Sequence, residues 1–299
     1  MKIKESVPDR IFLAFVYILM GVIALLCIYP FYYSIIISFN EGQDAMRGGI
    51  YLWPRAFTLE NYAVVFRDAM IVSAFGVTVL RTVIGTLAAL VFNSIFAYAL
   101  SRRILIGRRF YIYIGMFTMY FWGGIIPLYM LIQSLGLLNS FWVYIIPNLS
   151  GFFTILIFMA FYNEMPASIL ESAKIDGANE LVIFFRIVLP MSTAVLATIA
   201  LFSGVGHWNS WIETHLYIRD MRLQTLSYVL VRMINQGLAE EQLRAGGHLL
   251  ALGAAGEGTV TGNSMRMATM IVAVTPIMLI YPFLQKYFVK GIMLGAVKE

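Results

Sequence analysis

Residues 110–163 read FYIYIGMFTMYFWGGIIPLYMLIQSLGLLNSFWVYIIPNLSGFFTILIFMAFYN, a run of 54 residues without a charged side chain. One membrane crossing by an α-helix needs about 20 apolar residues. The run is therefore long enough for two membrane-spanning helices. Polar and glycine residues near its middle suit the turn between them, namely Gln133, Ser134, Gly136, Asn139 and Ser140.

Four more apolar runs lie outside this one. They cover residues 11–40, 69–100, 187–212 and 267–285, and Arg81 is the one charged residue inside them. The first run is about twice too long for a secretory signal. Together the runs predict an all-α integral membrane fold with six transmembrane helices. The chain is 60% hydrophobic and 12% charged, against about 25% charged in soluble globular chains, which excludes an ordinary soluble enzyme.

The charged residues lie mostly between the spans. Six crossings place residues 1–10, 101–109, 164–186 and 286–299 on one side, with 12 Lys or Arg and 7 acidic residues. Residues 41–68, 133–143 and 213–266 lie on the other side, with 8 and 9. The positive-inside rule assigns the first side, and both termini, to the cytoplasm. The same rule accounts for the net charge of +5, so we expect no nucleic-acid partner.

Residues for catalysis or metal binding are not grouped in this sequence. The phosphate-binding pattern G-x-x-x-x-G-K-[ST] and the nucleophile pattern G-x-S-x-G do not occur, and no Cys and His cluster has metal-ligand spacing. The single cysteine, Cys27, lies inside the first apolar run and cannot form an internal disulfide. We therefore expect no enzyme activity, no metal site and no cofactor bound by this chain.

The longest segment on the cytoplasmic side covers residues 164–190 and reads EMPASILESAKIDGANELVIFFRIVLP. Ser168 with Glu171 three residues later predicts a capping box at the start of a short helix. Gly177 suits the end of that helix, because glycine adopts the left-handed conformation without strain. A second helix is expected from about Asn179 to the end of the segment. Such a helix pair either lies passively on the membrane surface or docks a cytosolic partner.

This segment carries a family pattern. Glu171-Ser172-Ala173, then Gly177 after three residues, Ile187 after nine, and Leu189-Pro190 after one more resembles the E-A-A-x3-G-x9-I-x-L-P loop of ABC importer permeases. Ser172 stands where that family usually has alanine. Residues 97–102, 206–209, 281–283 and 289–291 are similar to carbohydrate-uptake permeases. The likeness is greatest to the second permease of maltose-type importers, in the subgroup for complex oligosaccharides and polysaccharides, alginate-like ones among them.

The resemblance implies an assembly. A permease of this family pairs with a second, homologous permease, usually a different chain, and with two cytosolic subunits that bind ATP and Mg. An extracytoplasmic solute-binding protein delivers the saccharide. The resemblance also implies that Glu171 and Gly177 set the docking geometry and that Ala173 permits close approach of the ATPase subunit. The full set of implied ATPase-coupling residues is Glu171, Ser172, Ala173, Asp176, Gly177, Ile187, Leu189 and Pro190. The C-terminal tail, residues 294–299, either reaches the ATPase interface or ends frayed.

The solute path is expected among a few side chains. Arg81 costs about 3 kcal/mol to insert near the bilayer centre, so it should face the bundle interior or water, and structural pairing is favoured over contact with an acidic sugar. Aromatic rings stack on sugars, but for Trp208 and Trp211, close to the external boundary, an aromatic belt at the membrane interface is favoured over sugar contact. The candidate path residues are Arg81, Tyr120, Trp122, Trp208 and Asn209.

The organisation expected from the sequence is a single transmembrane domain over residues 1–299. It contains a permease core (71–288), a cytoplasmic coupling loop (164–190) and an external loop (213–266). The glycine-rich external loop promises little regular structure apart from a helix near residues 226–234, and it faces the solute-binding protein.

We interpret the chain as a subunit of an ATP-driven importer in the bacterial cytoplasmic (inner) membrane, forming half of the path for an oligosaccharide or polysaccharide. An ion-gradient-driven secondary carrier is the alternative. Such carriers use ionisable groups near the midplane, and Arg81 alone is available there. A non-transporting scaffold would leave the coupling motif unexplained.

Overall fold

The computed structural model of the protein describes residues 7–245 and 259–296. Helices make up most of these residues, and the described part contains no β-strand beyond an isolated bridge between Asn40 and Phe57. The chain divides into two compact units. One comprises residues 1–69 with 232–274, and the other comprises 70–231 with 275–299.

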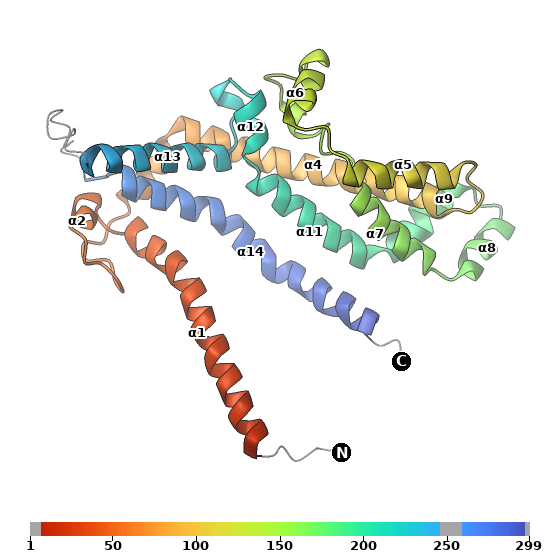
Figure 1. The fold of residues 1–299 in the computed structure, drawn as a ribbon, viewed down its shortest axis with the longest axis horizontal. Coiled ribbons are helices and arrows are strands. Elements are labelled where there is room, and N and C mark those ends of the chain that lie inside the picture. Colours follow the sequence, from red (N-terminus) through yellow and green to blue (C-terminus); the bar gives the residue numbers. More distant parts are fainter. Residues whose placement is uncertain (1–6, 246–258, 297–299) are drawn as a thin grey trace. The chain divides into compact units, whose positions relative to one another are not determined.

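The first unit holds three N-terminal helices, α1 (Val7–Ser38), α2 (Gly42–Met46) and α3 (Glu60–Arg67) (Figure 1). It also includes residues 232–245 of α13 (Leu226–Ala245) and residues 262–274 of α14 (Gly262–Ala296). The amide of Asn61 in α3 donates to the carbonyls of Ser38 and Asn40, both at 2.9 Å, and so fixes α3 at the end of α1. The apolar flank of α1 is exposed over most of its length, as expected of a helix that lipid or another chain covers.

The second unit is built on α4 (Ala69–Ser101), which α5 (Arg108–Tyr120), α7 (Phe152–Asn163) and α11 (Thr193–Asn209) accompany. The helix α6 (Ile125–Ser134), the short 3-10 helix η1 (Phe141–Tyr144) and α12 (Ile212–Tyr217) form a second apolar cluster with α4. Two close approaches use glycine. A Cβ on Gly115 of α5 would lie 1.9 Å from the Phe152 ring of α7, and one on Gly85 of α4 would lie 2.6 Å from the His207 ring of α11.

The described helices agree with a membrane protein. Three of them, α1, α4 and α14, are individually long and apolar enough to cross a membrane, and the number rises to six if each of three bent helix pairs is counted as one span. This count rests on length and composition. The predicted turn within residues 110–163 is confirmed, since α6 ends at Ser134 and both Gly136 and Asn139 have positive φ.

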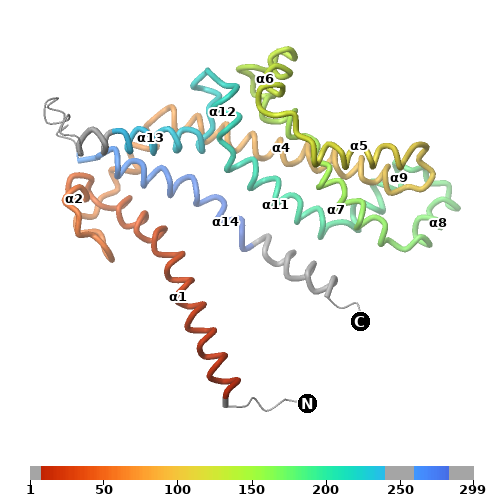
Figure 2. Tube along the Cα trace, in the orientation of Figure 1, coloured from red at the N-terminus to blue at the C-terminus, as the bar shows by residue number. Residues whose placement is uncertain are grey.

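Two features of residues 110–163 were not expected. The first half is broken at residues 121–124, where α5 and α6 meet at 117° (Figures 1 and 2), because Gly124 adopts φ 92°. In the second half, α7 begins only at Phe152, after the Pro147 and Gly151 positions that disfavour a continuous helix. The α-helix of the second half therefore starts well after the predicted turn, which ends at Ser140.

The expectation of little regular structure in residues 213–266 is wrong for its first part. Here α12 is followed by a 3-10 turn, η3 (Met221–Leu223), and by the 20-residue helix α13. The predicted helix near residues 226–234 is confirmed and continues to Ala245. Its start is fixed by a tertiary contact, in which the Leu226 amide donates to the Thr78 hydroxyl of α4 at 2.8 Å. Residues 246–258, which include five of the glycines of this segment, lie outside the described residues.

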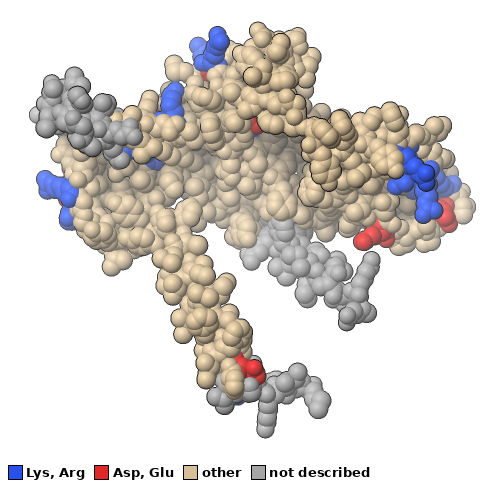
Figure 3. Space-filling view, in the orientation of Figure 1, with Lys and Arg blue, Asp and Glu red and all other residues tan. Residues whose placement is uncertain are grey.

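Charged side chains gather at helix ends. Figure 3 shows Lys and Arg at the end of the second unit that carries the connection from α4 to α5, while the flanks of the helices in this view are largely uncharged. Four arginines lie at this end, Arg102 and Arg103 in the connection and Arg108 and Arg109 in the first turn of α5.

Candidate functional site

The segment of residues 164–190, named here the EAA loop, begins with the short helix α8 (Ala167–Ile175). The predicted capping box is wrong. The N-cap is Pro166, and no side chain caps the helix. Because Pro166 has a fixed φ, −57° here, the chain enters the helix one residue before Ser168, which then lies inside the first turn.

The end of α8 is as predicted from the sequence. Gly177 has φ 81°, a left-handed conformation that any side chain would strain. The Ala178 amide donates to the Ala173 carbonyl, and the Gly177 amide donates to the Lys174 carbonyl, both at 3.0 Å. These two bonds form a Schellman motif, so the last carbonyls of α8 are satisfied within the loop itself.

The second helix of the EAA loop also begins as predicted. Asn179 is its N-cap, and its side chain accepts a hydrogen bond from the Val182 amide at 2.9 Å. The helix runs through α9 (Glu180–Ile183), a π-helical turn η2 (Phe184–Val188) and α10 (Leu189–Met191). Pro190 lacks an amide proton, and its ring would crowd the carbonyl four residues earlier. A wider π-turn just before it keeps the chain helical past the proline, where the sequence predicts an end.

The loop presents some predicted coupling residues to solvent and keeps others inside. Glu171, Ser172, Asp176, Gly177 and Pro190 are exposed, and Ile187 and Leu189 are half-buried. Ala173 is buried, in an apolar cluster with Tyr162, Ile183 and Phe184 of the same chain. Its small side chain therefore lets α8 pack closely against α7 and α9.

One polar cluster in the EAA loop escaped the sequence analysis. Glu180 of α9 pairs with Lys174 of α8 at 2.9 Å and with Arg102 at 3.3 Å, and it accepts a hydrogen bond from the Tyr98 hydroxyl of α4 at 2.5 Å. Burial raises the pKa of Glu180, but hydrogen bonds from Lys174 and Tyr98 and the charge of Arg102 outweigh burial and lower the pKa to about 2. The carboxylate therefore stays charged and ties both loop helices to the end of α4.

Two apolar side chains beside the Gly177 turn were also missed. Ile175, the last residue of α8, is 86% exposed, and Leu181 of α9 is 67% exposed. Large apolar side chains at this exposure in a polar loop are typical of surfaces that another protein covers. The sequence signal that would have found them is their position, two residues before the glycine and four after it.

Arg81 lies inside the second unit, and its side chain is only 1% exposed. Its guanidinium donates to the Ser210 carbonyl at 2.9 Å, pairs with the Glu213 carboxylate of α12 at 3.1 Å and lies 4.6 Å from the centre of the Tyr144 ring. Burial raises the pKa of Glu213, but the charge of Arg81 and a hydrogen bond from Ser210 outweigh it, so the net shift is downward. Arg81 thus holds α4 to the turn between α11 and α12.

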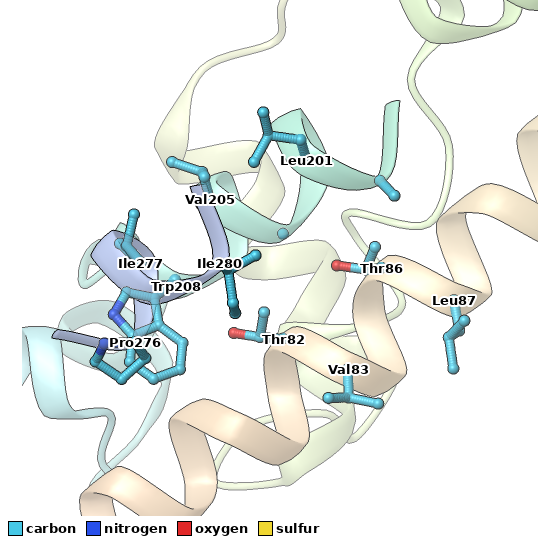
Figure 4. Close-up of a pocket in the computed structure, with 12 residues that line it drawn as sticks. Thr82, Val83, Thr86, Leu87, Leu201, Val205, Trp208, Pro276, Ile277 and Ile280 are labelled. Carbon is cyan, nitrogen blue, oxygen red and sulfur yellow. The ribbon is translucent and has the colours of Figure 1, made fainter. Parts of the chain in front are cut away.

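A groove of about 310 Å³ lies between α4, α11 and the part of α14 that belongs to the second unit (Figure 4). Its walls are apolar, and Trp208 forms part of them. Trp208 is only 8% exposed, so the aromatic-belt interpretation is wrong for this residue. Tyr120 and Trp122, at 77% and 71% exposure, and the exposed Asn209 do not line the groove. The structure therefore does not bring the predicted path residues together.

Comparison with known proteins identifies the family of this chain. The family model of the binding-protein-dependent transport system inner membrane component matches residues 81–294. The chain belongs to this family. Its members are the membrane-spanning subunits of ATP-driven importers, so this permease is a transport component rather than an enzyme.

Several relatives resemble the permease over nearly its whole length. The polygalacturonan/rhamnogalacturonan transport system permease protein YtcP of Bacillus subtilis is 37% identical over 97% of this chain and 99% of its own. Protein LplC of the same organism is 35% identical over 93% and 92%. A solved bacterial ABC transporter involved in the import of the acidic polysaccharide alginate matches with a TM-score of 0.86 and 28% identity, covering 96% of this chain and all of that one.

Proposed function

We propose that this permease forms half of the path by which an oligosaccharide or polysaccharide enters a bacterial cell across the cytoplasmic membrane. A second, homologous permease supplies the other half, and an extracytoplasmic solute-binding protein delivers the cargo. Support comes from the family match and from relatives whose names refer to polysaccharides. We infer the other partners, two cytosolic subunits that bind ATP and Mg, from the family resemblance, and the EAA loop offers them a docking surface.

The observation that carries the coupling role is the outward face of this loop. Ile175 and Leu181 offer apolar area before and after the Gly177 turn, and the acidic residues Glu171 and Asp176 of the same loop are exposed as well. Apolar side chains at the centre of a contact, with charged groups around them, are the usual anatomy of a protein interface. We assign this face to the ATPase subunit.

The loop is also ordered before any partner arrives. Its backbone turn is closed by the Schellman bonds, and Glu180 fixes both helices to α4. A partner that binds such a surface loses little free energy to ordering it. Movement of the ATPase subunits then reaches α4 through Glu180 without first deforming the loop.

The proposed orientation places the EAA loop and both termini in the cytoplasm. The arginines between α4 and α5 lie on the same side as Glu180, since Arg102 pairs with it. Clusters of Lys and Arg are enriched in cytoplasmic connections. Residues 297–299 of the C-terminal tail lie outside the described residues, so contact of that tail with the ATPase stays a prediction.

A matched pair of substitutions tests this function. Leu181, 67% exposed, lies on the EAA loop, and Leu52, 71% exposed, lies in the connection between α1 and α3 on the opposite side of the proposed orientation. The full complex is purified in mild detergent with Leu181→Asp or with Leu52→Asp. We expect Leu181→Asp to lose the ATPase subunit and substrate-stimulated ATP hydrolysis, and Leu52→Asp to keep the ATPase subunit.

The opposite result is equally clear. If the parent protein brings down no ATPase subunit, or if Leu181→Asp retains it as fully as Leu52→Asp does, docking through this face is wrong. Uptake that follows an imposed ion gradient and ignores ATP would indicate the secondary-carrier alternative.

A further inference from the structure

The groove between α4 and α11 holds two polar atoms without a partner among the described residues. The hydroxyl oxygens of Thr82 and Thr86, one turn apart on α4, are buried and make no hydrogen bond. Both residues line the groove, and Figure 4 shows them on its α4 wall, across from the α11 and α14 side chains. A buried hydroxyl left unpaired costs about 1–3 kcal/mol, so the arrangement calls for an occupant with hydrogen-bonding groups.

Other threonines of this protein show what is unusual here. A helical threonine commonly donates to the carbonyl four residues earlier. Thr78 donates in this way to Ala74 at 2.8 Å, and Thr198 donates to Ala194 at 2.9 Å. Thr82 and Thr86 follow Thr78 along the same row of α4, yet their hydroxyls make no such bond.

The aromatic member of the groove is held in place. The Trp208 ring meets the Phe75 ring edge to face, with centroids 6.0 Å apart, and its backbone carbonyl accepts a hydrogen bond from the Ser227 hydroxyl at 2.7 Å. A rigid indole offers a flat apolar surface on the α11 wall of the groove.

The groove carries no charged side chain among its lining residues. Arg81 precedes Thr82 in the sequence, but its guanidinium is directed to Ser210 and Glu213. A binding site that is largely apolar with a few hydroxyl groups recognises the ring and the hydroxyl groups of a ligand rather than its charge.

We propose that the α4–α11 groove is a subsite for one sugar ring of the transported saccharide. The apolar C–H face of the ring stacks on Trp208, and its hydroxyls exchange hydrogen bonds with Thr82 and Thr86, each of which can donate and accept. This proposal rests on the proposed function. A lipid acyl chain would leave both threonine hydroxyls unpaired, which is why a sugar fits the groove better.

The test uses the complete importer in proteoliposomes, with uptake and substrate-stimulated ATP hydrolysis as readouts. The two probes are a short oligogalacturonide and the same oligogalacturonide with its carboxylates methyl-esterified. The variants are Thr82→Val, Thr86→Val and Trp208→Leu, and Thr198→Val on α11 is the control, because its hydroxyl bonds to its own helix and does not line the groove.

We expect KM to rise about 3- to 10-fold for each threonine substitution, as the loss of one hydrogen bond implies. Trp208→Leu should raise KM by about tenfold or more. The rise should be equal for the charged and the esterified probe, and Thr198→Val should leave KM within twofold of the parent.

Other outcomes overturn the proposal in distinct ways. An unchanged KM in all three groove variants shows that the sugar does not bind there. Loss of the second permease on purification shows that the groove seats a helix of that chain. If KM rises for the charged probe alone, the groove does not bind the sugar independently of its charge, as the proposal requires. If the parent complex takes up neither probe while its ATPase subunits are bound, the proposed cargo class itself fails.

Discussion

Replacing Glu213 with glutamine should destabilise the second unit, because it removes the negative charge paired with Arg81. The Arg81 side chain is 1% exposed and that of Glu213 is 16% exposed, so solvent cannot take the place of the lost carboxylate. Breaking a buried ion pair from one side costs about 3–5 kcal/mol. The Ser210 carbonyl and the Tyr144 ring still face the guanidinium, and Glu213 is partly wet, so we expect about 2–3 kcal/mol.

The assay is the thermal unfolding of the purified protein in detergent. A loss of 1 kcal/mol lowers Tm by about 2–4 °C for chains of 150–250 residues, so Glu213→Gln should lower Tm by roughly 5 °C or more. The double variant Arg81→Met with Glu213→Leu removes both charges and should recover most of the loss, because an apolar replacement for a buried pair is often neutral. Asp44→Asn is the comparison, because it removes an ion pair whose cation, Arg55, is 49% exposed; it should lower Tm by less than Glu213→Gln does.

The reasoning would be refuted by a particular pattern. If Glu213→Gln left Tm within 1 °C of the parent and instead changed the KM for transport, Arg81 would belong to the solute path and not to the packing. Equal losses of Tm in the single and double variants would mean that the side chains matter for their shape and not for their charges.

Three further predictions concern the EAA loop and the helix packing. Gly177→Ala forces a side chain into φ 81° and should cost about 1 kcal/mol or more, seen as weaker retention of the ATPase subunit on purification. The pKa of Glu180 is lowered from 4.5 to about 2, so its contribution to stability is complete above pH 4.5 and is lost as the pH falls toward 2; the Tm difference between the parent and Glu180→Gln should be constant from pH 8 to pH 5 and shrink below pH 4.5. Gly85→Ala places a Cβ 2.6 Å from the His207 ring and should lower stability by about 1–3 kcal/mol, measured by thermal unfolding; an unchanged Tm would show that the ring moves aside freely.

The sequence predicted those parts of the structure that depend on local composition. The long uncharged runs identified the apolar helices, Gly177 identified the end of α8, and Asn179 identified the start of the helix after it. Each of these follows from the conformational or hydrophobic preference of residues within one turn or one span.

The remainder depends on contacts between residues far apart in the chain. Nothing in the sequence connects Arg102 with Glu180, 78 positions later, and both read as ordinary loop charges. The partner of Arg81 was equally hidden, because Glu213 lies 132 residues away. The position of the groove was missed for another reason, since Thr82 and Thr86 look like common helix residues until their hydroxyls are seen without partners.

The two polar attachments of α4 have a mechanical consequence. Arg81 fastens this helix to the α11–α12 turn, and Tyr98 and Arg102 fasten it to the EAA loop. The attachments are about 30 Å apart along an α-helix, and no proline interrupts α4 between them. An α-helix without a kink does not shorten along its axis, so a displacement of one end is transmitted to the other end. We expect the EAA loop and the Ser210–Glu213 turn to travel together whenever α4 moves, with the same displacement and without delay.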